Sequence, residues 1–219
     1  MIATETDYQT LFAMLPPDAV VTLYNISWDE YEAFLNEFDE QPHVRLSYDN
    51  GRLDLMTVSL EHEKIKALLP HIILMLALEL NLNFLGAGSS TLRKKQQAKG
   101  TDPDDCYYFK NYQQISGKKR LDLSVDPPPD LAIEVDITNR SIHKFPIYAA
   151  LEVPELWRHN GEEVFFYELV DEDYLEVSHS RLFPFLTPAV LLDFLQRGEA
   201  QGVVVMANEF RQWVQANKA

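Results

Sequence analysis

The chain has 219 residues, and its 34 acidic against 19 basic side chains give a formal net charge of −15 at pH 7. This acidic balance argues against non-specific binding to nucleic acid, which depends mainly on neutralising phosphates, but it leaves room for a local basic patch. The single cysteine, Cys106, excludes an internal disulfide and a cysteine-rich zinc site.

The length suits one domain that buries a substantial core. The longest apolar stretch without a charge, residues 67–77, is too short to span a bilayer. The N-terminal segment carries acids where a signal peptide would be basic. We therefore expect a cytoplasmic protein that makes no membrane contact.

The first part of the chain predicts a lead-in, a helix and a hairpin. Residues 1–26 show no clear period over most of their length and read as an N-terminal lead-in. Ser27 then precedes apolar residues at helical spacing over 28–38, which predicts a capped amphipathic helix. Residues 43–48 and 52–58 alternate in polarity around an Asp-Asn-Gly turn, and this pattern predicts a β-hairpin.

Ser59 is expected to cap a long helix whose apolar stripe runs from Ile65 to Leu80, with a bend near Pro70. His62 lies three residues before Ile65 and should face the protein interior. Two interpretations of His62 stay open. It is either a hydrogen-bonded histidine at the edge of the core, which we favour, or a residue beside an active site.

Two short strands are expected around Gly86 and Gly88, ending in the basic residues 93–95. An acidic turn then leads into an aromatic strand, where alternation places Asp104 on the face of Cys106 and Tyr108. Residues 113–120 read as a polar loop with a second basic cluster, Lys118, Lys119 and Arg120. Both basic clusters are typical of solvated edges.

Residues 126–160 organise the chain, because three prolines are followed by a pattern of strand, helix and strand. In the apolar run 131–137, Glu134 and Asp136 share one face of the strand. A strand of this kind is expected to be central and covered on both faces, so both carboxylates would be buried and would need compensation. A divalent cation or the nearby Lys144 could provide it.

The position of Lys144 depends on where the following helix begins. If the helix includes Lys144, the spacing to Tyr148 places both side chains on its inward face. If the helix starts only at Pro146, Lys144 lies in the connection, still near the carboxyl end of the strand. Asp130 is a competing acid, but four residues of strand separate it from Glu134 by about 13 Å. We expect Asp130 to cap the start of the strand.

The rest of the chain completes the fold. Residues 155–159 and 164–169 flank an Asn-Gly turn and predict a second hairpin, to which 174–177 could add a strand. Residues 187–196 and 201–216 look helical and are expected to cover the sheet.

Several segments together resemble the Uma-two family of cyanobacterial restriction endonucleases, within the PD-(D/E)XK nuclease superfamily. They are ISWDEYEAF, YDNGRLDLM, LEHEKIK, DPDDCYYF, PPPDLAIEVDITNRS and VPELWRHNG. The resemblance implies an α/β restriction-endonuclease-like core, with a central mixed β-sheet flanked by helices, to which this chain would add β-hairpins and C-terminal helices. We place this domain at residues 27–180, and a C-terminal helical extension at 181–219.

The resemblance also implies a site. The superfamily acids fall on Asp104, which follows Pro103, and on Glu134, while Asp136 stands where the superfamily has lysine. Lys144 would replace that lysine, and His62 or Glu61 would assist. Asp104, Glu134 and Asp136 would bind Mg²⁺ or Mn²⁺, which prefer oxygen ligands. Asp136 could strengthen metal binding or mark a site that no longer cuts.

The implied activity is hydrolysis of DNA by metal-activated water, with a homodimer expected because restriction nucleases commonly pair to cut two strands. A catalytically silent module that kept the fold is the alternative. A small-molecule hydrolase ranks last, because the sequence shows no nucleophile elbow and no paired Ser and His.

Overall fold

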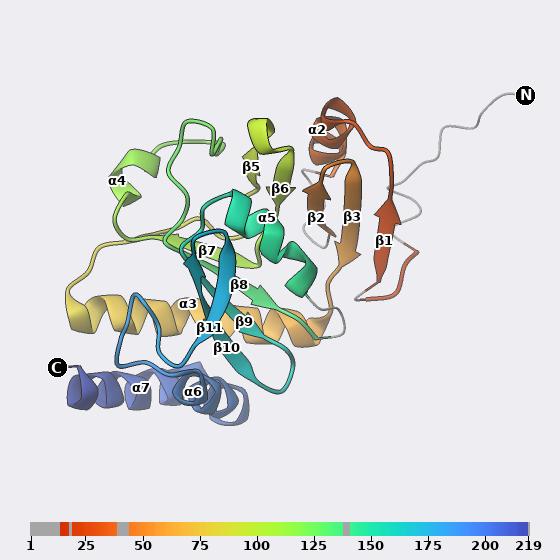
Figure 1. Cartoon of the computed structure of the whole chain (residues 1–219). Helices are drawn as coiled ribbons and strands as arrows, with labels where there is room; N and C mark the ends of the chain where they lie inside the picture. Colours follow the sequence, from red (N-terminus) through yellow and green to blue (C-terminus); the bar gives the residue numbers. More distant parts are fainter. Residues whose placement is uncertain (1–13, 18, 39–43, 138–140, 219) are drawn as a thin grey trace, which may run out of the picture.

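Two β-sheets stand next to each other, and helices cover their outer faces (Figure 1). The computed structural model describes residues 14–17, 19–38, 44–137 and 141–218. Every strand pair of the first sheet is antiparallel. Its strands, in spatial order, are β1 (Val20–Leu23), β3 (Arg52–Thr57), β2 (Val44–Asp49), β6 (Lys99–Thr101) and β5 (Leu92–Lys94).

The second sheet is the mixed sheet that the sequence predicts. Only β8 and β9 run parallel, and the helical crossover that parallel strands need lies between them. Its strands, in spatial order, are β11 (Asp173–Val177), β10 (Val164–Val170), β9 (Glu155–His159), β8 (Leu131–Val135), β7 (Asp105–Tyr108) and β4 (Leu85–Gly86).

The N-terminal helix and hairpin form as predicted. Ser27 and Glu30 make a reciprocal capping box at the start of α2 (Trp28–Glu37). In the hairpin turn, Asn50 and Gly51 both have positive φ, which a tight two-residue turn requires. The predicted start of the hairpin at His43 lies outside the described residues. Strand β1 was not predicted, and it lies in the segment interpreted as a lead-in, where it pairs with β3.

The long helix α3 (Leu60–Leu80) also begins where predicted. The Ser59 side chain accepts a hydrogen bond from the His62 backbone N–H at 3.2 Å. The helix continues through Pro70 and ends at Asn81, whose left-handed conformation closes it. One face of α3 packs on the second sheet and on the two C-terminal helices, α6 (Pro188–Gln201) and α7 (Val203–Asn217). These helices match the two segments expected to be helical.

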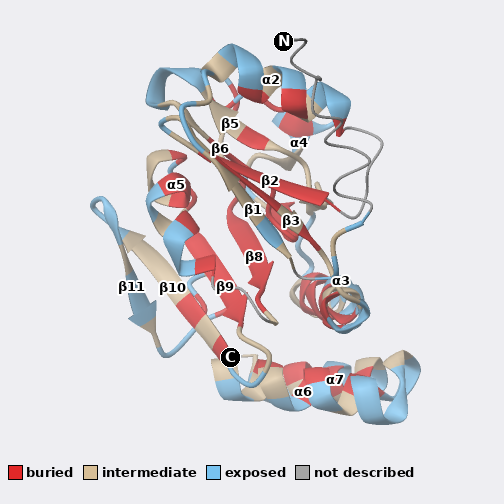
Figure 2. Ribbon diagram, turned by 90° about the vertical axis from the view of Figure 1, so that its right-hand side faces the viewer, coloured by how far each residue is buried: buried red, intermediate tan, exposed pale blue. Residues whose placement is uncertain are grey.

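Strand β8 is buried along its whole length, as Figure 2 shows. Leu131, Ile133 and Val135 face the core below α3, α6 and α7. Ala132 faces a second core that includes Tyr148 of the short helix α5 (Phe145–Ala150). The predicted alternation of side chains is therefore confirmed, although the strand ends two residues earlier than expected.

Besides α5, the described connections hold three further short helices. The 3₁₀ turn η1 (Lys95–Gln97) precedes β6, and the 3₁₀ turn η2 (Ser141–Lys144) leads directly into α5. A one-turn helix, α4 (Tyr112–Ile115), occupies the beginning of the segment predicted as a polar loop. Among the described residues, no helix combines the length and the apolar character needed to cross a bilayer.

Candidate active site

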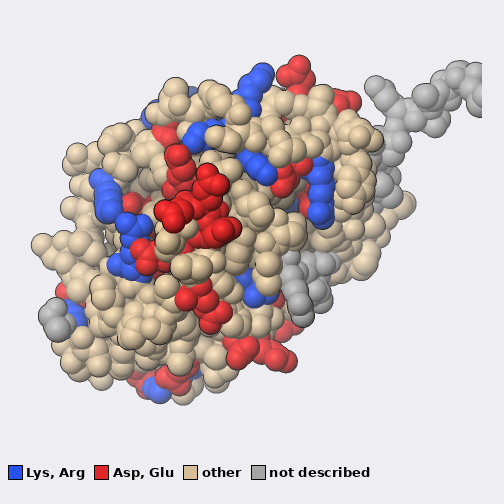
Figure 3. Space-filling model, viewed as in Figure 1, with Lys and Arg blue, Asp and Glu red and all other residues tan. Residues whose placement is uncertain are grey.

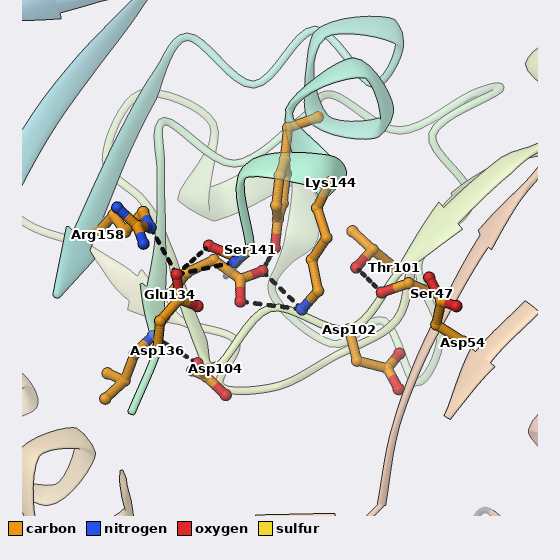
Figure 4. Close-up of polar contacts among 12 residues, drawn as sticks. Ser47, Asp54, Thr101, Asp102, Asp104, Glu134, Asp136, Ser141, Lys144 and Arg158 are labelled. Carbon is orange, nitrogen blue, oxygen red and sulfur yellow. Dashed lines mark hydrogen bonds and ion pairs between the residues drawn. The ribbon is translucent and has the colours of Figure 1, made fainter. Parts of the chain in front are cut away.

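Four chain segments bring polar side chains together where β8 ends (Figure 4). Glu134 lies on β8 and is 2% exposed. Its two carboxylate oxygens accept hydrogen bonds from Lys144 Nζ at 2.9 and 3.1 Å. The Tyr148 hydroxyl donates to the same carboxylate. The structure thus places Lys144 beside Glu134, where the sequence analysis expected a compensating charge.

Lys144 reaches this position from the turn before α5. It is the last residue of η2, and Pro146 lies in the first turn of α5, where a missing backbone N–H is tolerated. Of the two alternatives for Lys144, the connection is therefore the one observed. Tyr148 follows at i+4 and meets Glu134 from the same side. The spacing was visible in the sequence, but no role was assigned to Tyr148.

Asp104 links β7 to β8 immediately before β7 begins. Its backbone N–H donates to the Ile133 carbonyl at 3.1 Å, and its Oδ2 accepts from the Val135 N–H at 2.7 Å. Its Oδ1 lies 2.9 Å from His62 Nε2. Both side chains are almost fully buried. His62 is therefore a buried histidine, as the favoured interpretation expected, and it contacts Asp104; a role beside an active site stays a prediction.

Asp136 is held by a partner that the sequence analysis missed. Arg158 of β9 donates from Nε to Asp136 Oδ2 at 2.5 Å. The Ser141 backbone N–H and hydroxyl donate to the same oxygen at 2.8 and 3.0 Å. The parallel register pairs Arg158 with Glu134 on β8, which brings the guanidinium to the end of that strand. Asp136 therefore anchors the start of η2 and is neutralised by arginine.

Asp130 takes the role expected for it. Its Oδ2 accepts hydrogen bonds from the backbone N–H groups of Phe109 and Lys110 at 2.7 and 2.9 Å. These contacts tie the segment after β7 to the residue that precedes β8. Asp130 therefore caps the beginning of the strand, while Glu134 and Asp136 lie towards its other end.

The charges of the cluster perturb one another strongly. Burial raises the pKa of Glu134 to about 7; the Lys144 charge opposes this rise, and the charges of Asp104 and Asp136 add to it. Burial would raise the pKa of Asp104 as well, but the hydrogen bond and charge of His62 hold it below its usual value. Desolvation lowers the pKa of Lys144, but the combined attraction of Glu134, Asp104 and Asp136 outweighs it, so the pKa is raised. Lys144 is thus charged at neutral pH, and Glu134 is close to its titration point.

The first sheet faces Lys144 from the other side. Figure 4 shows Asp102, Asp54, Ser47 and Thr101 on this side of the lysine. Asp102 is buried, and its Oδ2 accepts from the Leu46 N–H at 3.0 Å. Burial raises the pKa of Asp102, while the charge of Lys144 lowers it. Asp102 was not predicted as a site residue, because the sequence does not show that the two sheets meet here.

Two carboxylates of the cluster meet the requirements of a divalent ion better than the third. Asp104 and Glu134 offer the hard oxygen ligands that Mg²⁺ prefers, and this ion is commonly held by one or two carboxylates together with water and substrate phosphate. Asp136 is already engaged by Arg158 and Ser141. Within the described part of the chain, no three or more His, Cys, Asp or Glu side chains are arranged to hold an ion. The residues therefore fit a two-carboxylate site better than the three-carboxylate set.

The Uma2 family model, described as "Putative restriction endonuclease", matches residues 28–197, which is most of the chain. The chain belongs to the Uma2 family. No curated protein matches it. A crystal structure from Anabaena variabilis, described as a "putative nuclease", matches with a TM-score of 0.50 and 15% sequence identity, over 74% of this chain and 98% of that one. At this identity the match supports the nuclease-like α/β fold of the Uma2 chain and nothing finer.

Proposed function

We propose that this Uma2 protein is a metal-dependent endonuclease that hydrolyses phosphodiester bonds of DNA. The observation that carries the proposal is the buried pair of Glu134 and Lys144, next to Asp104 on the neighbouring segment. A lysine beside two carboxylates suits the hydrolysis of phosphodiester bonds, which is the activity named in the family's description. Two copies of the chain would be suited to cutting two strands.

Asp104 and Glu134 are the residues that would hold Mg²⁺ or Mn²⁺. When bound, such an ion polarises the phosphate and lowers the pKa of an attached water. Other side chains of the protein orient the two carboxylates and contact the phosphate. His62 fixes the orientation of Asp104, and Tyr148 fixes that of Glu134. The Lys144 ammonium can donate a hydrogen bond to a phosphate oxygen whose negative charge grows as the bond breaks.

Asp136 has a positioning role in this proposal. Its contacts with Arg158 and Ser141 fix the turn that presents Lys144. An acid at the position of the superfamily lysine is therefore compatible with activity, because its charge is compensated by arginine and the lysine arrives from η2.

A catalytically silent module remains the second candidate, and one observation favours it. Each of the three carboxylates already has a side-chain partner in its own chain, and all three are at most 7% exposed. An assembly of this kind is stable without a metal. The two candidates differ in whether an ion can join Asp104 and Glu134.

The test is plasmid cleavage by the purified protein with Mg²⁺, with Mn²⁺ and with EDTA. We expect metal-dependent nicking that falls at least about 10²-fold in Asp104→Asn and in Glu134→Gln, since each change removes a charged oxygen ligand that would hold the metal ion. Glu199→Gln, on the exposed surface of α6, is the matched control and should cleave like the parent. Calorimetric titration should show that the two site variants lose metal affinity.

One outcome of the same assay would favour the silent module. A parent protein that binds neither ion and leaves plasmid and single-stranded DNA intact, while its circular dichroism shows a folded chain, contradicts the nuclease proposal. Cleavage that survives both site variants would remove these residues from the mechanism.

A further inference from the structure

One pocket of the molecule lies outside the carboxylate cluster. A pocket of about 510 Å³ opens between the segment 85–93 and the loop 115–121, with one side formed by α2. None of its lining residues belongs to the candidate active site. This volume is within the range of pockets that take small organic ligands, roughly 300–1,000 Å³.

The pocket has a charge opposite to that of the chain. Four of its lining side chains are cationic and none is acidic, although the chain has 34 acidic and 19 basic residues. Figure 3 shows a concentration of acidic side chains at the centre of one face, with Lys and Arg to its left, above it and to its right. Positive charge is therefore locally concentrated, and the pocket holds four of these cations: Arg93, Lys118, Lys119 and Arg120.

Two of these cations are available to a ligand. Arg93 pairs with Glu32 at 2.6 Å, and Lys118 pairs with Asp126. Lys119 and Arg120 are exposed, and neither has an acidic partner among the residues that the structure describes. Their two uncompensated charges match the charge of a phosphate monoester, which is about −1.5 to −2 at neutral pH.

The remaining lining suits the rest of a nucleotide. Hydroxyl groups come from the segment that precedes β5, and apolar side chains come from α2, α4 and both loops. Pockets for organic ligands typically combine an apolar surface with a few placed polar groups in this way. The hydroxyls belong to Ser89, Ser90 and Thr91, and the apolar side chains include Leu35, Leu85, Ile115 and Leu121.

The pocket borders the candidate active site through one pair of residues. The side chain of Thr91, in the pocket wall, lowers the pKa of buried Asp102, although the burial of Asp102 outweighs this effect. The charge of Lys144 acts on the same carboxylate. A nucleic-acid strand and a free nucleotide both carry the phosphate that the cations of this pocket match.

We propose that this pocket is a phosphate-binding site for a nucleotide unit, with Lys119 and Arg120 as its main anion contacts. The proposal concerns a site separate from the carboxylate cluster. Ligand binding there needs neither a divalent ion nor cleavage.

The experiment measures binding in EDTA, where the proposed nuclease activity is absent. The probes are inorganic phosphate, adenosine monophosphate and a fluorescent eight-residue single-stranded DNA, titrated against the full chain. We expect binding of adenosine monophosphate to weaken at least tenfold in the double variant Lys119→Ala/Arg120→Ala. For the oligonucleotide, the slope of log affinity against log salt should become shallower by about 1.4, since two phosphate contacts are lost.

The control removes the same charge elsewhere. Lys64→Ala/Arg181→Ala changes two exposed cations outside the pocket and should alter affinity less than twofold. Equal weakening in both double variants would overturn the site, because it would reflect net charge alone, and so would a parent that binds none of the probes. Similar affinities for the nucleotide and the oligonucleotide would identify a free nucleotide as the ligand, whereas tighter binding of the oligonucleotide would identify a strand.

The outcome of a nuclease assay does not depend on whether the pocket binds a nucleotide. Loss of plasmid cleavage in Glu134→Gln with unchanged nucleotide binding supports both proposals. Nucleotide binding without any cleavage by the parent would retain the pocket and reject the endonuclease.

Discussion

Glu134 has two kinds of neighbour, a cation that favours its ionised form and acids that oppose it. Lys144 and Tyr148 hydrogen-bond its carboxylate, whereas Asp104 and Asp136 add negative charge nearby. Perturbation of this kind, in which burial and named partners compete, is frequent at functional sites. Removing either partner of the Glu134–Lys144 pair would leave the other as an uncompensated buried charge, which is strongly destabilising.

The first prediction at this scale concerns Lys144→Met, which keeps much of the side-chain volume and removes the charge. We expect single-turnover cleavage to slow by about 10²- to 10³-fold, because a donor aimed at developing charge is lost. Metal affinity, measured by calorimetry, should not weaken, since lysine is not a magnesium ligand. Lost affinity with unchanged turnover would contradict the role given to Lys144.

A second prediction concerns the pair of His62 and Asp104. Burial alone would lower the pKa of His62, but the hydrogen bond and charge of Asp104 raise it above its usual 6.5. A raised folded pKa means that the protonated pair stabilises the fold fully below about pH 6.5, and that this contribution is lost as pH rises through the folded pKa.

Urea unfolding in EDTA at pH 6 and pH 9 would measure this effect. His62→Ala should lower the free energy of unfolding by about 1.5–3 kcal/mol at pH 6, the range for a hydrogen bond to a charged group, and by less at pH 9. His71→Ala changes an exposed histidine of the same helix and serves as control. A cost that is the same at both pH values would show that the pair is not protonated in the fold.

At the scale of elements, the close packing of α2 on β6 depends on Gly100. A Cβ added at Gly100 would lie 2.9 Å from Cζ of Tyr31, a distance that real side chains do not show. Tyr31 is fully buried and stacks on Tyr48, so its ring has little room to move. The absence of a side chain at Gly100 is therefore required by the helix that packs above it.

The corresponding prediction is that Gly100→Ala destabilises the protein by about 1–3 kcal/mol, the usual cost of overpacking. The same substitution in a Tyr31→Phe background should cost less, because the closest atoms include the hydroxyl that this change removes. Chemical denaturation of the parent, the two single variants and the double variant measures the coupling free energy between Gly100 and Tyr31. Additive effects would show that the contact with Tyr31 is not the cause.

Local patterns predicted most of the elements, because each depends on residues close in sequence. Capping serines marked the starts of α2 and α3, and the period of two placed Glu134 opposite the main core. Strand β1 was missed, since its pairing with β3 brings together residues thirty or more positions apart. Arg158 was missed for a related reason. Its contact with Asp136 follows from the parallel register of β8 and β9, which no local pattern specifies.

At the scale of the whole molecule, the C-terminal helices share a core with the mixed sheet. Phe194 and Phe210 lie in the same apolar cluster as Ile133 and Trp157. Without α6 and α7, this face of the sheet would be exposed to water together with part of α3. The sequence indicated that these helices would cover the sheet, but it could not indicate which of the two sheets they would contact.

This arrangement predicts that a chain ending at residue 180 does not fold cooperatively. We expect its thermal unfolding, followed by circular dichroism, to lose the sharp transition of the full chain, because a large apolar surface is left unburied. Restoring α6 and α7 as a separate peptide should recover part of the transition. A truncated chain that unfolds as sharply as the full one would show that the helices are accessory.

Cys106 offers a direct report on such openings. It lies within β7, is fully buried, and has a thiol pKa raised by burial. An alkylating reagent needs the exposed thiolate, so the native chain should resist modification for as long as β7 stays paired with β8. The rate at which the thiol is labelled therefore measures how often β7 separates from β8. A single natural side chain thus reports on the opening of the mixed sheet without an introduced probe.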